Sequence, residues 1–261
     1  MINSLYSLFG YKFMFWLGFI LSFIYGLCIG SFLNVVIFRL PIHESLSKEA
    51  SHCFKCGNKI KWYDNIPLFS YIILRGKCRK CGDRISLQYP IVELLNAILW
   101  VLIYFKYGYS VETLVYIILS SVLVCIAFID EKTFEIPAIL NGWILVIGII
   151  YTVYDYKHWL THIIGMLCVS FVLFLIWFFT DGIGFGDVKL MFCSGLLLGW
   201  HIIIPSFLIG CIIAIIIHSI RMKVSNKGHK LAFGPYLSLG IYVGLFVGQP
   251  LMTMYLRLIG V

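Results

Sequence analysis

Charged residues are scarce in this chain of 261 residues: only 12% are Asp, Glu, Lys or Arg, about half the share that a soluble domain carries. Apolar residues make up 61% of the chain. A soluble fold of this size has too little interior to bury so many apolar side chains, and a composition this apolar also excludes a disordered chain. The composition therefore predicts a polytopic membrane protein.

Acidic residues are the rarer charges, with 12 Asp and Glu against 20 Lys and Arg. Several catalytic patterns are missing from the sequence as well. No G-x-S-x-G, H-E-x-x-H or P-loop sequence occurs, which removes serine hydrolases, zincin proteases and nucleotide-driven pumps. In a membrane protein, a net charge of +8 relates first to the orientation of the spans and to contacts with lipid headgroups. We therefore expect membrane lipids and no nucleic acid as partners.

Long uncharged runs are what the sequence has in abundance. The first covers residues 13–38, and further apolar blocks lie at 90–105, 111–129, 136–154, 159–179, 190–220 and 231–256. The block 190–220 is too long for one span and is interrupted by Gly199-Trp200-His201 and Pro205, so we expect a short helix, a tight turn and a second helix there. The sequence thus predicts an all-α protein with about eight transmembrane helices.

The positive charges predict the orientation of these spans. Of the 20 Lys and Arg residues, 16 fall in the loops 39–89, 130–135, 180–189 and 221–230, which share one side if there are eight spans. The positive-inside rule places that side in the cytoplasm and both chain ends outside. We expect three domains: the first transmembrane helix (1–38), a small cytosolic module (39–89) and a membrane core (90–261).

Four of the nine cysteines form two C-x2-C pairs in residues 39–89, which we call the cysteine module. The pairs are Cys53-Phe54-Lys55-Cys56 and Cys78-Arg79-Lys80-Cys81, and each is followed by a glycine. This spacing is close to that of zinc ribbons, since two intervening residues let both thiolates bind one tetrahedral ion. We expect a structural Zn²⁺ bound by Cys53, Cys56, Cys78 and Cys81. Two disulfides are the alternative, which a cytosolic location disfavours.

Two aspartates fall at the predicted cytosolic ends of spans. Asp130 ends the third span, and Asp187 stands in Gly184-Phe185-Gly186-Asp187, where the sixth begins. Each alone has an ordinary explanation, as an interfacial charge for Asp130 and as a helix N-cap for Asp187. Together, two carboxylates in a partly dehydrated site can share a proton and hydrolyse a peptide bond, one as base on a water and the other as acid.

Other polar residues support this hypothesis less directly. Gly184 and Gly186 allow the backbone to come close to another chain, as an extended substrate requires. Glu93 lies a few residues into the second span, where an ionisable group has either a structural partner or a functional role, and both possibilities stay open.

The ordered set of motifs resembles the type IV prepilin peptidase family along nearly the whole chain. Besides the paired cysteines and the two aspartate segments, the resemblance is carried by Gly30-Ser31-Phe32-Leu33-Asn34, Asp64-Asn65-Ile66-Pro67-Leu68-Phe69-Ser70-Tyr71, Tyr89-Pro90-Ile91-Val92-Glu93, Val188-Lys189-Leu190 and Phe233-Gly234-Pro235-Tyr236. The family pattern differs at Phe54, Ala138 and Leu231-Ala232, none of which is a proposed zinc ligand or catalytic aspartate.

The resemblance implies a G-x-G-D intramembrane aspartic protease in the bacterial inner membrane, with its active site facing the cytoplasm. On this interpretation Asp130 and Asp187 are the catalytic pair, and Gly184, Gly186, Lys189 and Glu93 are supporting or substrate-loop residues. The implied substrates are prepilins or pseudopilins of type IV pilus and type II secretion systems, which carry a basic leader before a hydrophobic helix. The implied second activity methylates the new N-terminus with S-adenosylmethionine.

A competing hypothesis is a non-catalytic transporter or assembly scaffold whose zinc module docks a partner. It explains the spans and the cysteines equally well. It gives no reason for two aspartates at the cytosolic edge beside a glycine-flanked loop.

Overall fold

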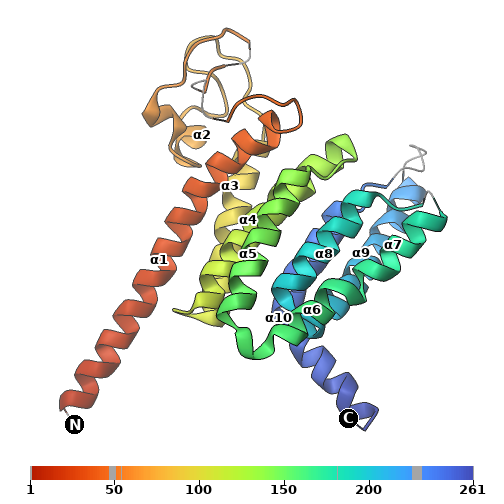
Figure 1. Cartoon of the computed structure of the whole chain (residues 1–261). Coiled ribbons are helices and arrows are strands. Elements are labelled where there is room, and N and C mark those ends of the chain that lie inside the picture. Colours follow the sequence, from red (N-terminus) through yellow and green to blue (C-terminus); the bar gives the residue numbers. More distant parts are fainter. Residues whose placement is uncertain (1, 47–50, 54, 181, 225–230, 261) are drawn as a thin grey trace. The chain divides into compact units, whose positions relative to one another are not determined.

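The computed structural model describes residues 2–46, 51–53, 55–180, 182–224 and 231–260, and its helices follow the order of the predicted spans (Figure 1). The main helices are α1 (Ile2–Arg39), α3 (Gln88–Tyr107), α4 (Val111–Thr133), α5 (Ala138–Tyr154), α6 (Trp159–Cys168), α7 (Ser170–Phe179), α8 (Phe185–Leu198), α9 (Trp200–Val224) and α10 (Gly234–Leu258). The short ones are η1 (Trp62–Asn65), α2 (Phe69–Ile73) and η2 (Tyr156–His158). No strand occurs within the described ranges, and the all-α fold class is confirmed.

Six helical segments are long and apolar enough to cross a membrane, judged by length and composition alone. They are Lys12–Arg39, Gln88–Tyr107, Val111–Thr133, Tyr156–Phe179, Trp200–Met222 and Gly234–Leu258. At the other two predicted positions lie shorter helices, α5 with 17 residues and α8 with 14. The predicted break in the block 190–220 is found at Gly199, whose φ of +73° ends α8. Of the predicted loop 221–230, residues 225–230 lie outside the described part of the chain.

The chain divides into two compact units, Met1–Cys125 and Ile126–Val261, which we describe separately. In the first unit, α1 packs along α3 through the glycine-containing motif of α1. A Cβ on Gly30 would lie 2.7 Å from Glu93 Cα, so only glycine lets the two helices approach this closely. One turn further, the Asn34 side chain donates a hydrogen bond to the Tyr89 carbonyl at 3.1 Å.

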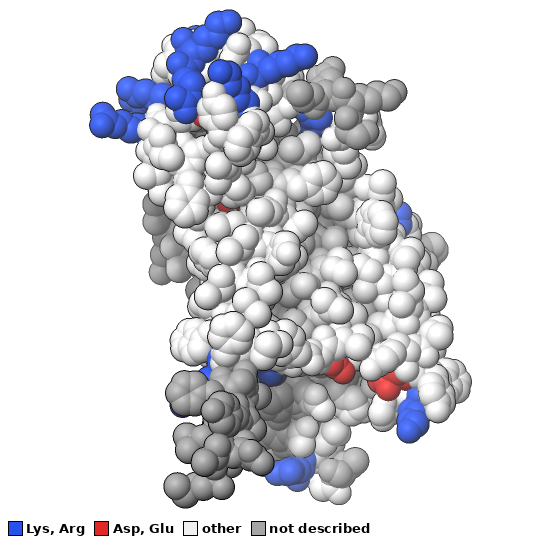
Figure 2. Space-filling model, turned by 90° about the vertical axis from the view of Figure 1, so that its left-hand side faces the viewer, with Lys and Arg blue, Asp and Glu red and all other residues white. Residues whose placement is uncertain are grey.

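The cysteine module follows α1 and precedes α3 in the same unit, and exposed Lys and Arg side chains gather over it (Figure 2). Two ion pairs connect its segments: Arg79 with Asp64 at 2.6 Å and Lys55 with Asp83 at 3.0 Å. The module thus has its own polar contacts in addition to its cysteines.

In the second unit, α8 is the central helix and is surrounded by α5, α6, α7, α9 and α10. All but four of its 14 residues are buried, which explains how so short a helix is held in place. Its closest neighbour is α6, where a Cβ on Gly195 would overlap the Gly165 carbonyl oxygen. This close packing fixes the helix that begins with the G-x-G-D segment.

Candidate active site

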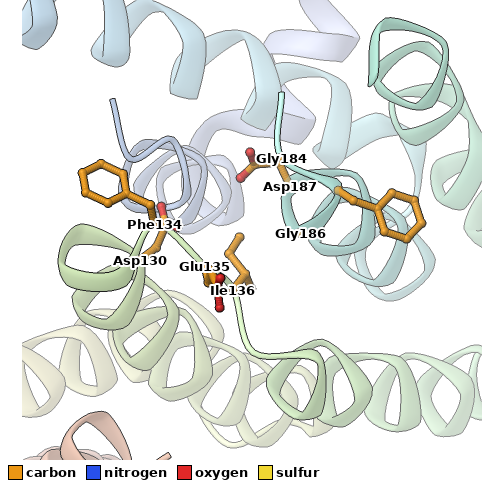
Figure 3. Close-up of a pocket in the computed structure, with 8 residues that line it drawn as sticks. Asp130, Phe134, Glu135, Ile136, Gly184, Gly186 and Asp187 are labelled. Atoms are coloured by element: carbon orange, nitrogen blue, oxygen red, sulfur yellow. The ribbon is translucent and has the colours of Figure 1, made fainter. Parts of the chain in front are cut away.

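Asp130 and Asp187 line one pocket of the second unit although 57 positions separate them in the sequence (Figure 3). Asp130 lies in the last turn of α4, and Asp187 lies in the first turn of α8. Both side chains belong to buried residues, with exposed fractions of 5% and 7%. The structure therefore brings together the two carboxylates that the sequence nominated.

The pocket encloses about 260 Å³ and is built from two short loops and the helix ends beside them. Phe134, Glu135 and Ile136 come from the α4–α5 loop, and Gly184 to Asp187 come from the segment that starts α8. Figure 3 shows the two carboxylates entering from opposite sides of this space. Such a pocket has room for a short piece of extended peptide and a water molecule.

The Asp130 carboxylate is held by the start of α10. The Gly234 N–H donates a hydrogen bond to Asp130 Oδ2 at 2.8 Å. A Cβ at position 234 would lie only 2.7 Å from the same oxygen, so glycine is required for this approach. The sequence motif Phe233-Gly234-Pro235 gave the position of this glycine but not its contact with Asp130.

Asp187 is not the N-cap of its helix, because α8 begins at Phe185 and Gly184 is the residue that precedes it. Asp187 also lies outside the six segments that are long and apolar enough to cross a membrane. Burial, and then the nearby charge of Asp130, raise the pKa of Asp187 from its ordinary value of 3.8 to about 7, although a hydrogen bond with the Gly184 backbone opposes the shift. Asp187 is therefore able to hold a proton near neutral pH.

The other residues nominated from the sequence have different surroundings. Gly186 packs against this chain's own Ile136, whose Cβ would be 3.0 Å from a Cβ at position 186. Lys189 is exposed, and its ammonium group lies 4.6 Å from the centroid of the Phe185 ring. Glu93 belongs to the first unit, where its Oε2 accepts a hydrogen bond from the Leu68 N–H at 2.8 Å. Glu93 therefore has a structural partner.

Phe134 and Glu135 also line the pocket, and sequence reasoning did not nominate Phe134. Phe134 has a φ of +58°, a left-handed conformation that is uncommon for a bulky residue. Its N–H donates to the Asp130 carbonyl at 2.9 Å, and α4 ends at Thr133, directly before it. No sequence signal marks this conformation, since glycine is the usual residue at such a helix end.

The four cysteines of the module form a compact cluster in the first unit. Their sulfur atoms all lie within 4.8 Å of one another, and Cys53 Sγ is 3.8 Å from Cys81 Sγ. Four thiolates around one ion at the usual Zn–S distance of about 2.3 Å have sulfurs about 3.8 Å apart, so the cluster fits a tetrahedral metal. A disulfide requires sulfurs about 2 Å apart.

The two cysteine pairs lie on turns of the same construction, 25 positions apart. The Gly57 N–H donates to the Cys53 carbonyl at 2.8 Å, and the Gly82 N–H donates to the Cys78 carbonyl at 2.9 Å. Both glycines have left-handed backbones, with φ of +65° and +71°, as their position after each pair predicts. Phe54, where the chain departs from the family pattern, lies outside the described residues.

Two family models match the chain over these features. "Bacterial Peptidase A24 N-terminal domain" matches residues 24–107, and "Type IV leader peptidase family" matches residues 117–219. Proteins named "Prepilin leader peptidase/N-methyltransferase" align over nearly the full length. The one from Xanthomonas campestris pv. campestris is 34% identical over 90% of this chain and 93% of its own length. Those from Aeromonas salmonicida and Pseudomonas putida are 33% and 30% identical, over 94% and 92% of this chain and 96% and 94% of their own lengths.

This chain belongs to the type IV leader peptidase family. The prediction of an enzyme of this family is therefore confirmed, as is that of a multi-pass membrane protein. No solved structure gives a significant match. Within this leader peptidase, the N-terminal match contains the whole cysteine cluster, and the second match contains both pocket aspartates but ends before Gly234.

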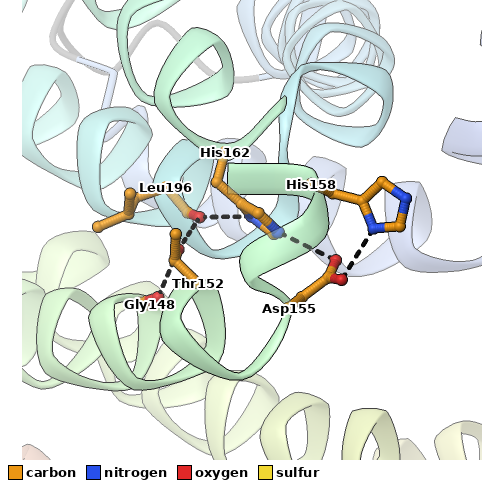
Figure 4. Close-up of polar contacts among 6 residues, drawn as sticks. All are labelled: Gly148, Thr152, Asp155, His158, His162 and Leu196. Carbon is orange, nitrogen blue, oxygen red and sulfur yellow. Dashed lines mark hydrogen bonds and ion pairs between the residues drawn. The ribbon is translucent and has the colours of Figure 1, made fainter. Parts of the chain in front are cut away.

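The opposite end of α8 in this leader peptidase is fixed by polar side chains (Figure 4). His162 Nδ1–H donates to the Leu196 carbonyl at 2.9 Å, and the Thr152 hydroxyl donates to the same oxygen at 3.4 Å. Asp155 lies 3.4 Å from the other nitrogen of His162 and 2.8 Å from His158. Because the last four carbonyls of a helix lack donors within the helix, these contacts anchor the helix that carries the pocket aspartate.

Proposed function

We propose that this protein removes the leader peptide from type IV prepilins or pseudopilins, with Asp130 and Asp187 as its catalytic pair. The observation that carries the proposal is the meeting of two buried carboxylates from separate helices in one pocket. The names of the relatives supply the substrate class and the second activity, methylation of the new N-terminus. A basic leader before a hydrophobic helix is the expected form of the substrate.

The two carboxylates suit hydrolysis by an activated water. Asp187, whose pKa is about 7, holds the shared proton, which leaves Asp130 as the base. Asp130 takes a proton from the water while the water oxygen bonds to the scissile carbonyl carbon, and Asp187 gives its proton to the carbonyl oxygen. When the C–N bond breaks, the proton on Asp130 passes to the leaving amine, and one hydroxyl of the tetrahedral diol returns a proton to Asp187 as the new carboxyl group forms. The Gly234 N–H keeps the base oriented throughout.

The cleavage assay tests the catalytic pair directly. D130N and D187N variants, checked for folding by monodisperse elution in detergent, are expected to leave a co-expressed prepilin uncleaved. E131Q is the matched control, because Glu131 is an exposed neighbour that pairs with Arg221 at 3.6 Å. Full cleavage by either Asn variant would falsify the assigned pair.

Glu135 is the residue we propose to meet the basic leader. Its carboxylate is exposed and lines the pocket, and its charge is opposite to that of a basic leader. E135Q is expected to raise KM for a leader with Lys or Arg and to leave kcat nearly unchanged, as the loss of a binding contact requires. Equal KM values for the two enzymes would remove Glu135 from the leader site.

We propose that the pocket faces the cytoplasm across the bacterial inner membrane. The 16-to-4 distribution of Lys and Arg supports this orientation through the positive-inside rule. An alkaline phosphatase fused after Val261 is expected to be active, since that end is predicted to lie outside. An inactive fusion at normal expression would reverse the orientation.

We propose that Cys53, Cys56, Cys78 and Cys81 hold a structural Zn²⁺. The fit of their sulfur spacing to a tetrahedral ion supports this assignment. With four protein ligands the ion has no open position for substrate, so it folds the module. Metal analysis is expected to find one zinc per wild-type chain and none in the C53S/C56S variant. A zinc-free wild type would refute the assignment.

Methylation of the cleaved N-terminus is the second activity we propose, with S-adenosylmethionine as the methyl donor. Mass spectrometry of the mature pilin tests the activity: one added methyl group at its N-terminus is expected. An unmethylated N-terminus after complete cleavage would make the protein a peptidase alone.

A further inference from the structure

One part of the cysteine module exposes apolar side chains instead of charged ones. We call Trp62–Ile73, which contains η1 and α2, the interfacial segment. Trp62 is 81% exposed, and Phe69, Ile72 and Ile73 of α2 are 63%, 69% and 72% exposed. These three α2 positions are spaced i, i+3 and i+4 and therefore share one face of the helix. Four large apolar residues beside one another are unfavourable in water.

The interfacial segment is tied to a helix that is long and apolar enough to cross the membrane. The N–H of Leu68, directly before α2, donates to the Glu93 side chain at 2.8 Å. Glu93 is the sixth residue of the span Gln88–Tyr107, about 7 Å along the axis from its first residue. This bond holds the start of α2 beside the second turn of the span.

The connection before α2 is also restrained. Leu68 has a φ of +60°, which a leucine adopts only where its surroundings impose it. The Ser70 hydroxyl donates back to the Ile66 carbonyl at 2.7 Å, and the Tyr71 ring covers Gly76. The polar side chains of α2 therefore face the module, while its apolar side chains face outward.

Cationic side chains frame the apolar face. Lys61 precedes Trp62 directly, Arg75 follows Ile73 by two positions, and both are exposed. Figure 2 shows Lys and Arg gathered over the module and few acidic side chains among them. An apolar face bordered by Lys and Arg matches the boundary between the headgroups and the acyl chains of an anionic bilayer.

We propose that the interfacial segment lies in the surface of the bilayer, with Trp62, Phe69, Ile72 and Ile73 inserted among anionic lipids. The module is then attached to the membrane at a third place besides α1 and α3. This proposal concerns lipid binding and does not depend on the assignment of the catalytic pair. A docking surface for the hydrophobic helix of a substrate is the competing outcome that the test separates.

Photocrosslinking in nanodiscs tests the proposal on the full-length protein. The photoreactive p-benzoylphenylalanine is placed at Phe69 or Ile72, and at Lys80 as a matched exposed position on the second cysteine turn. In phosphatidylglycerol nanodiscs, lipid adducts are expected at 69 and 72 and only background at 80. Adduct yield is expected to fall several-fold in phosphatidylcholine nanodiscs, because the cationic border then lacks its partner.

Several outcomes would overturn the proposal. One is the absence of lipid adducts at 69 and 72 in protein that elutes as a single species, and another is equal yields at 69, 72 and 80. Equal yields in the two lipids would remove the anionic preference. If an added prepilin crosslinks at 69 and 72 and the lipid adducts disappear, the segment is a surface that binds the substrate. As an independent measurement, brominated phosphatidylglycerol is expected to quench wild-type fluorescence more than that of W62F.

Discussion

Replacing Asp187 with Asn is expected to stabilise the folded protein at neutral pH while it abolishes cleavage. Between pH 3.8 and about 7, the folded protein keeps the Asp187 proton and the unfolded chain does not. The wild-type protein therefore loses stability as pH rises through this interval, and the loss is complete above about pH 7. The interval between the two pKa values corresponds to about 4 kcal/mol.

The amide of D187N has no charge to bury and escapes this loss. Thermal unfolding in detergent, followed from about pH 4 to pH 8, is the assay. The two proteins are expected to have similar Tm values at about pH 4 and to diverge as the pH rises, with D187N the more stable. At about 2–4 °C per kcal/mol, the upper limit of the difference at pH 8 is on the order of 10 °C.

The control is E131Q, which removes a charge from a side chain that is 50% exposed and is expected to leave Tm nearly unchanged at every pH. The reasoning would be refuted if the Tm curves of wild type and D187N ran parallel, or if D187N unfolded first at pH 8. Either result would mean that the Asp187 charge is already well solvated or paired in the folded protein.

Three further substitutions test the surroundings of the pocket. G234A is expected to displace the Asp130 carboxylate, because the new Cβ would lie 2.7 Å from Oδ2. The variant is expected to lower kcat roughly tenfold to hundredfold while Tm changes little. An unchanged kcat would contradict this role of Gly234. F134G relieves a left-handed backbone and is expected to raise stability by about 1 kcal/mol in thermal unfolding but to slow cleavage, whereas a lower Tm would show that the ring's packing dominates. H162A leaves the Leu196 carbonyl without its main hydrogen-bond donor and is expected to lower the free energy of unfolding by about 1–3 kcal/mol. H162Q is expected to recover part of this stability. Equal losses in both variants would mean that the packing of His162 matters and not its hydrogen bond.

The hydropathy pattern was sufficient to predict where the helices lie, since every predicted span is helical and the order is right. It also predicted the break near Gly199, because a glycine between two apolar runs permits a positive φ that ends the first helix. The interruption of the span 159–179 at Val169 carried no such signal, since Val169 is as apolar as its neighbours. Cysteine spacing predicted the cluster of four cysteines, because both members of each pair lie on one local turn.

The pocket was less accessible to sequence reasoning, because it depends on contacts between distant segments. Asp130 and Asp187 could be nominated as a pair, but their meeting depends on how the end of α4, the start of α8 and the start of α10 come together, which no local pattern encodes. The role of Gly234 is visible only once the Asp130 carboxylate is placed beside it. Phe134 was missed because its backbone conformation is imposed by the chain around it and is not one that phenylalanine prefers.

The burial of α8 has a consequence for how the reaction can be inhibited. Helices surround α8 along its length, and the pocket at its first turn is lined by the two loops 134–136 and 184–187 together with Asp130. On the proposed assignment of Asp130 and Asp187 as the catalytic pair, water and peptide both reach the carboxylates through the pocket between these loops. A small rigid molecule that spans Phe134 and Phe185 would therefore block the pocket to the water and to the peptide at the same time. Such a compound needs no group that imitates a tetrahedral intermediate.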